Sequence, residues 1–347
     1  MFTRSFVSKM MSLAFVIAIA VPLLFGCTPT PAATTAPNTP AETSAPVVAP
    51  TTAPAAADTA APVSTAKKTF VFGRYRDAIN PDPVMNDANA DIWYMQQYYS
   101  GLLRFTPDLQ VEPDLAESWD VSEDGLTYTF HLRPGIKFCD GSPITAEDWQ
   151  WSLDRAANKD NGIWWFTFDA VKKITATDQA VVFELSQPYV PFIYTPAMFN
   201  AVVMPKKQVE AAGGWEKFML KPCGSGPFIM KEWVKGDHML LERNPYYWEK
   251  GKPVLDEILI KTIPDDNTRI LALQKGDVDA INYPPFNRVS DLSKDPNLQV
   301  LQFKSTNTNY VTLNNRNKPF DDVKVRQALA MAIDRDAMIK TINFSVG

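Results

Sequence analysis

The sequence has few of the residues that build metal sites and covalent active sites. Its 347 residues include three cysteines and two histidines, which are too scattered to match the spacing of a zinc site or of a Cys/His catalytic pair. It contains no Gly-x-Ser-x-Gly and no His-Glu-x-x-His motif. The adjacent carboxylates Glu147 and Asp148 are explained by a position in the first turn of a helix. We therefore expect a protein that is not an enzyme and that has no metal and no cofactor.

Long runs of positive charge are also absent. The formal net charge is −5, and no run of Lys or Arg is longer than two residues. A protein that binds nucleic acid needs clustered basic groups against the phosphates. Nucleic acid is therefore not an expected partner. The 46% of hydrophobic and 21% of charged residues allow a large core and more than one domain.

The first 27 residues have the features of an export signal. Arg4 and Lys9 precede an apolar run over residues 10–25, which is shorter than the roughly 20 residues that span a bilayer. The Leu-Phe-Gly-Cys sequence that ends at Cys27 is similar to a lipobox, although its phenylalanine is bulkier than the small residue usual at that position. We expect a lipoprotein signal peptide over residues 1–27 with a lipid on Cys27. The alternative is an uncleaved signal anchor.

Residues 28–66 consist almost entirely of Pro, Ala and Thr. Large apolar side chains are scarce there, so burial cannot offset the entropy lost on ordering, and we expect a disordered linker. In a polyproline-like form it would extend roughly 100 Å, at about 3.1 Å per residue. A glycosylated stalk has the same composition and stays open as an alternative.

Residues 115–155 carry the clearest structural pattern of the globular part. Apolar and polar residues alternate over residues 128–133, which predicts a strand with one buried face. Thr145 followed by Asp148 predicts the capped start of a helix. Apolar positions that recur every three or four residues predict another helix over residues 89–105.

A strand, a helix and a second strand follow one another in the last third of the chain. The first strand is expected over residues 255–263, and Asp265 can cap a helix that runs to Lys275. Gly276 suits the end of that helix, and a short strand follows over residues 278–281. This order predicts a βαβ unit and so a parallel α/β sheet.

Three blocks of residues together carry a resemblance to a known family. The first block comprises Ala116, Glu117, Ser118, Trp119, Asp124, Gly125, Tyr128, Phe130, Leu132, Arg133, Phe138, Asp140, Gly141, Pro143, Thr145, Ala146 and Asp148. The second comprises Pro222, Gly224, Ser225, Gly226, Pro227, Phe228, Trp233, Gly236, Arg243, Asn244, Pro245, Tyr247, Trp248, Pro253, Asp256, Pro264, Asp265, Arg269, Gly276, Asp277 and Asp279. The third lies over residues 319–335. Their order and spacing resemble those of the extracellular solute-binding proteins of the peptide/nickel transport family, family 5, which serve ABC importers.

The resemblance implies an α/β fold of the two-lobed periplasmic-binding-protein type, type II, with an extra subdomain and an incomplete second lobe. Residues 67–304 would form lobe I, with a β-rich subdomain roughly over residues 115–220. Residues 305–347 would form the hinge crossing and the start of lobe II, so the chain resembles a truncated member. Two more strands are expected around the crossing, over residues 298–303 and 310–314.

The resemblance also implies a function. We expect a substrate-binding lipoprotein that captures a peptide-like solute, an oligopeptide or dipeptide, in a cleft between two lobes. It would deliver this solute to the permease and ATPase of an ABC importer, and it would lie in the cell envelope, outside the cytoplasm, on a lipid anchor. Alternatives on the same fold are an oligosaccharide-binding member and a non-transport receptor of a chemosensory or chaperone-like kind.

Candidate ligand contacts follow from topology, because loops after sheet strands carry the ligand contacts in open α/β sheets. Trp164 and Trp165 offer flat aromatic area, although general burial statistics favour a place at the edge of the core. The candidates in lobe I and at the crossing are Tyr75, Arg76, Trp164, Trp165, Asn309 and Tyr310.

Cys139 and Cys223 each lie just before a glycine-containing turn. An exported protein can hold a disulfide between them, and closing so long a loop would stabilise the fold by a few kcal/mol. Since the sequence does not show that their Cα atoms lie close together, pairing and free thiols both stay open.

Overall fold

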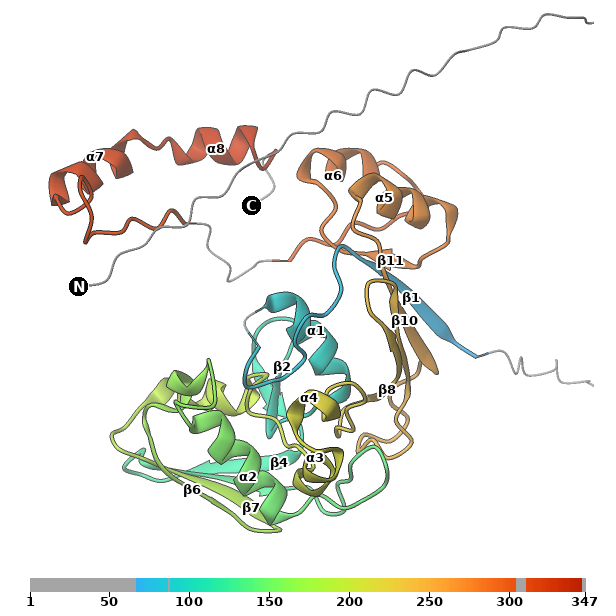
Figure 1. The fold of residues 1–347 in the computed structure, drawn as a ribbon, viewed down its shortest axis with the longest axis vertical. Coiled ribbons are helices and arrows are strands. Elements are labelled where there is room, and N and C mark those ends of the chain that lie inside the picture. The colour runs from blue at the N-terminus through green and yellow to red at the C-terminus, as the bar shows by residue number, and fades with distance from the viewer. Residues whose placement is uncertain (1–66, 87, 304–309, 345–347) are drawn as a thin grey trace, which may run out of the picture. The chain divides into compact units, whose positions relative to one another are not determined.

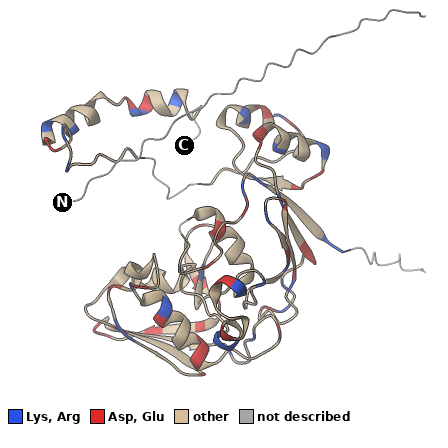
Figure 2. Cartoon of the chain, in the orientation of Figure 1, with Lys and Arg blue, Asp and Glu red and all other residues tan. Residues whose placement is uncertain are grey.

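The structure is a computed structural model that describes residues 67–86, 88–303 and 310–344 (Figure 1). Cys27, the export signal and the Pro/Ala/Thr linker lie outside the described residues, as does Asn309. Within the described part of the chain, no helix combines the length and the apolar character that a bilayer crossing needs. Acidic and basic residues are interspersed along the described elements (Figure 2).

A five-stranded mixed sheet has the order β11-β1-β10-β9-β8. Its strands are β1 (Thr69–Arg74), β8 (Phe228–Val234), β9 (His238–Arg243), β10 (Glu257–Thr262) and β11 (Ala280–Ile281). β1 is parallel to both of its neighbours, β10 and β11, whereas β9 is antiparallel to β10 and to β8. The prediction of a parallel sheet is therefore confirmed for three strands only, β1, β10 and β11. The β8–β9 hairpin adds an antiparallel edge to it.

The predicted strand, helix and strand over residues 255–281 are confirmed. Helix α5 (Asp266–Lys275) begins where the side chain of Asp265 accepts a hydrogen bond of 2.7 Å from the backbone N–H of Thr268. It ends at Gly276, whose φ of 79° is a left-handed conformation that glycine adopts without a steric penalty. β1 lies between the two strands of this unit, β10 and β11.

A second sheet is antiparallel throughout and has the order β4-β5-β7-β6. Its strands are β4 (Ala116–Val121), β5 (Thr127–Leu132), β6 (Val171–Ala176) and β7 (Ala180–Leu185). In β5 the side chains of Tyr128, Phe130 and Leu132 are buried and their neighbours are not, which confirms the predicted alternation. His131, on the other face of β5, places Nε2 2.7 Å from a carboxylate oxygen of Asp120.

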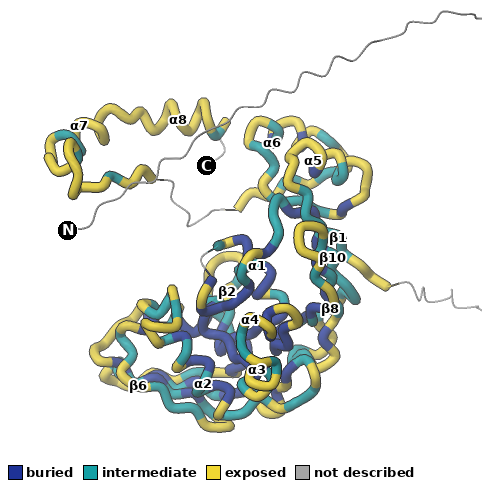
Figure 3. Tube along the Cα trace, in the orientation of Figure 1, coloured by how far each residue is buried: buried dark blue, intermediate teal, exposed yellow. Residues whose placement is uncertain are grey.

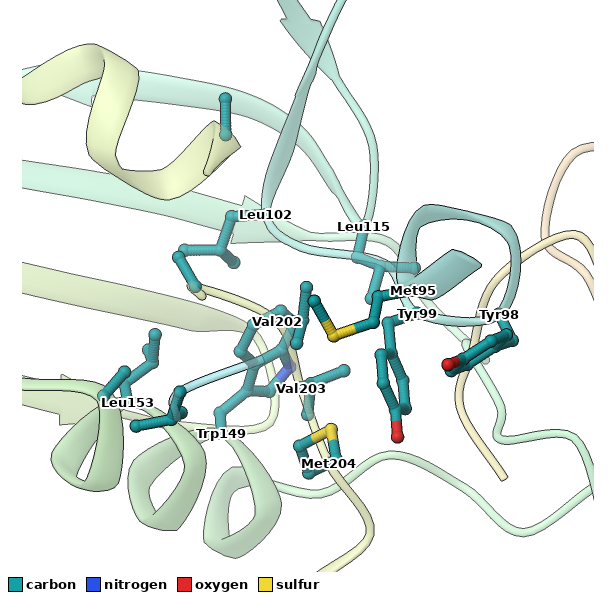
Figure 4. Close-up of a cluster of buried hydrophobic side chains, with 14 of the residues drawn as sticks. Met95, Tyr98, Tyr99, Leu102, Leu115, Trp149, Leu153, Val202, Val203 and Met204 are labelled. Carbon is teal, nitrogen blue, oxygen red and sulfur yellow. The ribbon is translucent and has the colours of Figure 1, made fainter. Parts of the chain in front are cut away.

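Helix α2 (Ala146–Ala157) contributes to the core beside this sheet. Its predicted capping box is present, because Thr145 Oγ1 accepts from the N–H of Asp148 and the Asp148 carboxylate accepts from the N–H of Thr145. Trp149 and Leu153 on this helix are fully buried, in a cluster that also contains Met95 and Leu102 (Figure 4).

The helix expected over residues 89–105 is too long. Helix α1 (Asn89–Tyr98) ends early, and β2 (Leu103–Phe105) then pairs with β3 (Val111–Pro113). The carbonyl oxygen of Tyr98 accepts a hydrogen bond of 3.1 Å from the N–H of Gly226 instead of one from a further helical turn. A Cβ atom at Gly224 would lie 1.9 Å from that same oxygen, so this close approach between distant backbones requires glycine.

The structure joins Cys139 and Cys223 by a disulfide bond, with their Cα atoms 5.2 Å apart. The backbone N–H of Cys139 also donates to the carbonyl of Gly224 at 2.9 Å. The bond closes a loop across a sequence separation of 84 residues, for which chain entropy predicts a stabilisation of roughly 4.5 kcal/mol.

The remaining described helices are short. They are η1 (Trp165–Phe168), η2 (Val190–Ala197), α3 (Lys206–Ala212), α4 (Trp215–Phe218), α6 (Phe286–Leu292), α7 (Val323–Ala332) and α8 (Arg335–Thr341). No residue of α7 or α8 is buried (Figure 3). The prediction of two strands over residues 298–303 and 310–314 is wrong. Neither segment has a partner strand among the described residues, and a strand without a partner leaves its N–H and C=O groups unpaired.

Candidate functional site

The carboxyl ends of the three parallel strands meet at one edge of the mixed sheet. Arg74, the last residue of β1, stands in register with Thr262, the last residue of β10. On the other side of β1, β11 leads directly into Asn282 and Tyr283. In open α/β sheets, ligands bind at this kind of edge. We refer to Arg74, Tyr75, Thr262, Asn282 and Tyr283 as the polar edge.

Three aromatic rings meet at the polar edge. The ring of Tyr283 lies with its centroid 5.5 Å from that of Tyr75, edge to face, and 5.5 Å from that of Trp93 on α1, stacked. Tyr283 is 56% exposed and has a φ of 51°, a left-handed conformation that costs a residue with a side chain about 1–2 kcal/mol. A strained and exposed aromatic residue of this kind is common at ligand-binding sites.

The guanidinium of Arg74 is buried against the rings of Trp93 and Tyr94. The residue is 1% exposed, and its Cζ atom lies 4.5 Å from the ring centroid of Tyr94 and 4.8 Å from that of Trp93. Nη1 donates to the carbonyl oxygen of Ala90 at 3.1 Å. Nε and Nη2 have no hydrogen-bond partner among the described residues, and no described carboxylate forms an ion pair with this side chain. Burial lowers the pKa of Arg74, which is what an unpaired cation in a poorly solvated place undergoes.

Further polar atoms at this edge are buried and unpaired. Both amide atoms of Asn282 are in this state, and so is the hydroxyl of Thr262. Nε of Arg269 on α5 is also unpaired, although the rest of its guanidinium donates to Asp266 and to the carbonyl of Tyr283 at 3.1 Å. Six of the ten buried unpaired polar atoms in the described residues therefore belong to Arg74, Thr262, Arg269 and Asn282. Folded proteins seldom leave such groups without a partner, so this concentration indicates a place where something else binds.

The sequence-derived candidates are placed unevenly around this site. Tyr75 belongs to the polar edge, and Arg76 follows it, half-buried, with its carbonyl oxygen 3.3 Å from the hydroxyl of Tyr94. Trp164 lies elsewhere and has structural contacts. Its Nε1 donates to the carbonyl of Asn86 at 2.6 Å, and its ring packs edge to face on Phe199.

The other candidates are not brought to this edge by any described contact. Trp165 begins the short helix η1 and is half-buried. Tyr310 is 80% exposed, and Asn309 lies outside the described residues. Sequence reasoning missed Arg74, Trp93, Asn282 and Tyr283. The rule that selected Tyr75 after β1 would have selected Asn282 and Tyr283 if it had been applied to the strand predicted over residues 278–281.

A separate pocket of about 290 Å³ lies between α1, β2 and the segment over residues 197–202. Its two charged residues, Arg104 and Asp114, already have hydrogen-bond partners. Arg104 donates to Glu112 at 2.7 Å and to the hydroxyl of Tyr247 at 3.2 Å, and the buried carboxylate of Asp114 accepts from Trp248 at 2.8 Å. Burial raises the pKa of Asp114. Because these groups bond to protein partners, the pocket has fewer free donors and acceptors for a ligand than the polar edge has.

Comparison with known proteins decides the family. Residues 110–346 match the model of the bacterial extracellular solute-binding proteins, family 5 Middle. The chain belongs to this family. It is 36% identical over 247 residues to a glutathione-binding protein, GsiB, of Pectobacterium atrosepticum, an alignment that covers 71% of this chain and 48% of that protein. The chain thus spans about half the length of the curated relatives it matches.

Solved structures agree with this assignment. AgaA of A.tumefacien R10, solved with agropinic acid, has a TM-score of 0.70 and 32% identity over 79% of this chain and 55% of that one. DppA of Helicobacter pylori, solved with the peptide STSA, has a TM-score of 0.70 and 29% identity over 80% of this chain and 58% of that one. The expected fold class, an α/β periplasmic-binding-protein-like fold, is confirmed, and so is membership of a family that binds solutes.

Proposed function

We propose that this chain contributes one lobe of a receptor that captures a peptide-like solute between two lobes and presents it to the permease and ATPase of an ABC importer. The observation that carries the proposal is the set of buried, unpaired polar atoms at the polar edge. Buried donors and acceptors of this kind are costly unless a ligand pairs with them. An edge where parallel strands end is the expected place for that ligand.

The chemistry of the polar edge suits a peptide better than a purely apolar or purely sugar-like solute. Asn282 has both an amide donor and an amide acceptor without a partner, which match the C=O and N–H of a peptide group. The rings of Tyr75, Trp93 and Tyr283 supply apolar area for a side chain. One relative is a glutathione-binding protein and another was solved with the peptide STSA, and both support the same class of solute.

Capture would proceed by closure of two lobes. A solute that contacts both lobes binds the closed arrangement more tightly and shifts the population toward it, and the permease then recognises that arrangement. Tyr75 and Arg76 would make contacts from the first lobe, and Asn309 and Tyr310 would act at the crossing. Trp164 and Trp165 stay weaker proposals, because contacts with Asn86 and Phe199 already account for Trp164.

Thermal unfolding of the full chain with glutathione, dipeptides, the tetrapeptide Ser-Thr-Ser-Ala and oligosaccharides tests this function. A solute present at 100 times its Kd adds about 2.7 kcal/mol to the free energy of unfolding, so a bound peptide raises Tm by several degrees. The variant Asn282→Ala is expected to lose most of this shift.

The matched control for that experiment is Asn244→Ala. The amide of Asn244 is buried like that of Asn282, but it already donates to the carbonyl of Gly226 at 2.8 Å. This variant lowers the Tm of the free protein and leaves the peptide-induced shift unchanged. A shift produced by oligosaccharides alone would replace the peptide assignment with the sugar-binding alternative.

A lipid on Cys27 would hold this receptor at the outer face of a membrane in the cell envelope. Labelling cells with a radioactive fatty acid tests the anchor, since the label is expected on the wild-type chain and not on Cys27→Ala. Label on both chains, or on neither, would overturn it. Reading frames for a permease and an ATPase beside the gene would favour transport, whereas a neighbouring sensor kinase would favour a chemosensory receptor.

A further inference from the structure

Arg74 is buried and the side chain of Arg155 is only 12% exposed, and both guanidinium groups lie over a tryptophan ring. They differ in their hydrogen-bond partners. Arg155 lies 3.7 Å from the ring centroid of Trp215, and its two terminal nitrogens donate to the carboxylate of Asp82 at 2.9 and 2.6 Å. Arg74 lies over Trp93 and Tyr94 but has no carboxylate partner among the described residues. The fold therefore supplies a hydrogen-bonded acid for Arg155, whereas Asp91 acts on Arg74 only through its charge.

The two free donors of Arg74 form a specific pair. Nη1 is occupied by the carbonyl of Ala90, and the unpaired atoms are Nε and Nη2. The N–H bonds of Nε and Nη2 are adjacent and parallel on one side of the planar guanidinium, at the spacing of the two oxygens of a carboxylate. A guanidinium has no acceptor, so neither a cation nor a lone N–H of a ligand can pair with it.

We propose that Arg74 anchors a carboxylate of the solute through Nε and Nη2, so that the polar edge selects a free acid over the amide of the same compound; this rests on the proposed function. Asn282, at the end of the strand next to β1, would pair with the adjoining peptide group. Reaching Arg74 from solvent requires an aromatic neighbour to turn aside. Tyr283 is the most exposed aromatic residue of the polar edge, so its side chain is the one expected to move.

Calorimetry with three matched peptides tests this assignment on the full chain. The peptides are Ala-Ala, with a terminal carboxylate, Ala-Ala amide, with none, and Ala-Glu amide, with a side-chain carboxylate only. The acid is expected to bind at least about ten-fold more tightly than the plain amide, the usual scale for a charge-assisted pair of hydrogen bonds. If Ala-Glu amide binds as tightly as Ala-Ala, a side-chain carboxylate can occupy the site at Arg74. If Ala-Glu amide binds as weakly as Ala-Ala amide, Arg74 binds the terminal carboxylate.

Substitutions at Arg74 should abolish this preference. Arg74→Met is expected to bind acid and amide equally, and Arg74→Lys, which keeps the charge and loses the parallel donors, should keep only part of the preference. The control Arg155→Lys removes the same donor geometry from the arginine that already has an acid, so its ratio of acid to amide affinity stays that of the wild type. Urea unfolding of each variant checks that it is folded.

Nitrogen-15 NMR of labelled arginine supplies a readout at the site itself. The Nε resonance that disappears in Arg74→Met is expected to shift when acetate is added and to shift less with the same concentration of inorganic phosphate. Equal binding of Ala-Ala and its amide would overturn the carboxylate assignment and leave the proposed function intact. If acetate shifts the Nε resonance but no peptide binds, the carboxylate assignment stands and the proposed function is overturned. If phosphate shifts the resonance more than acetate does, the preferred anion is phosphate and the carboxylate assignment is wrong.

Discussion

The region where α2 meets the loop around Asp82 and the polar edge of the mixed sheet each bury an arginine against a tryptophan. In the first region Asp82 neutralises Arg155, and both side chains are nearly inaccessible, 8% and 12% exposed. In the second, Arg74 has free donors, and a strained tyrosine lies beside it. Removing one member of a buried ion pair destabilises the fold, whereas a buried cation without a hydrogen-bonded acid lowers stability unless a ligand pairs with it. The comparison thus separates a structural arginine, Arg155, from Arg74, for which we propose a role in binding.

The largest effect should come from breaking the paired arginine. Arg155→Met leaves the carboxylate of Asp82 buried without its partner, and we expect a loss of about 3–5 kcal/mol in the free energy of unfolding. Urea unfolding followed by tryptophan fluorescence measures it. A loss below about 1 kcal/mol would mean that the pair at this place acts like an exposed ion pair.

Removing both members of the pair should cost less than removing one. The double variant Arg155→Met, Asp82→Leu has no buried charge left at this place, so it is expected to recover about 1–3 kcal/mol relative to Arg155→Met alone. The same urea titration, completed with the single variant Asp82→Leu, gives the coupling energy. Additive losses would contradict the view that the burial of an unpaired charge dominates.

Strain at the polar edge predicts a smaller effect at Tyr283. Glycine adopts a φ of 51° without penalty and alanine does not, so Tyr283→Gly is expected to be about 1 kcal/mol more stable than Tyr283→Ala. Both variants lose the same stacking on Trp93, which makes the difference between them a measure of backbone strain. Thermal unfolding of the pair is sufficient, and equal Tm values would show that Tyr283 is not strained.

The smallest effect is expected at the unpaired arginine itself. Arg74→Met removes one hydrogen bond, to Ala90, together with the cost of burying a cation, and these contributions oppose each other. The free energy of unfolding should therefore change by less than about 1 kcal/mol, in contrast to Arg155→Met. Breaking a buried ion pair costs at least about 3 kcal/mol. A loss of about 3 kcal/mol or more in the same urea assay would therefore mean that Arg74 is structural.

Local signals in the sequence predicted local structure well. The alternation in β5 and the capping boxes or caps of α2 and α5 depend on residues within a few positions of each other, and all are present. The prediction over residues 89–105 was wrong for a non-local reason. The carbonyl that would have continued the helix binds Gly226, and nothing near residue 98 in the sequence signals this.

The candidate site was only partly accessible to sequence reasoning. Tyr75 follows from the rule that loops after parallel strands bind ligands, but the rule alone does not show which loops lie together. Tyr75 meets Tyr283 because β1 inserts between β10 and β11, whereas Trp164 is taken up by Asn86 and Phe199. Likewise, the disulfide between Cys139 and Cys223 depends on a Cα separation of 5.2 Å that their spacing in sequence does not show.

The sequence by itself determined the family and the positions of β5, α2, β10, α5 and β11, because these rest on spacing, alternation and caps within short segments. Only the tertiary structure decided which side chains meet at the polar edge and which buried arginine has no acid. Those outcomes depend on strand order and on contacts between residues some two hundred positions apart, such as Tyr75 and Tyr283. Pairing of buried charges is a property of the folded arrangement, and a list of residues does not contain it.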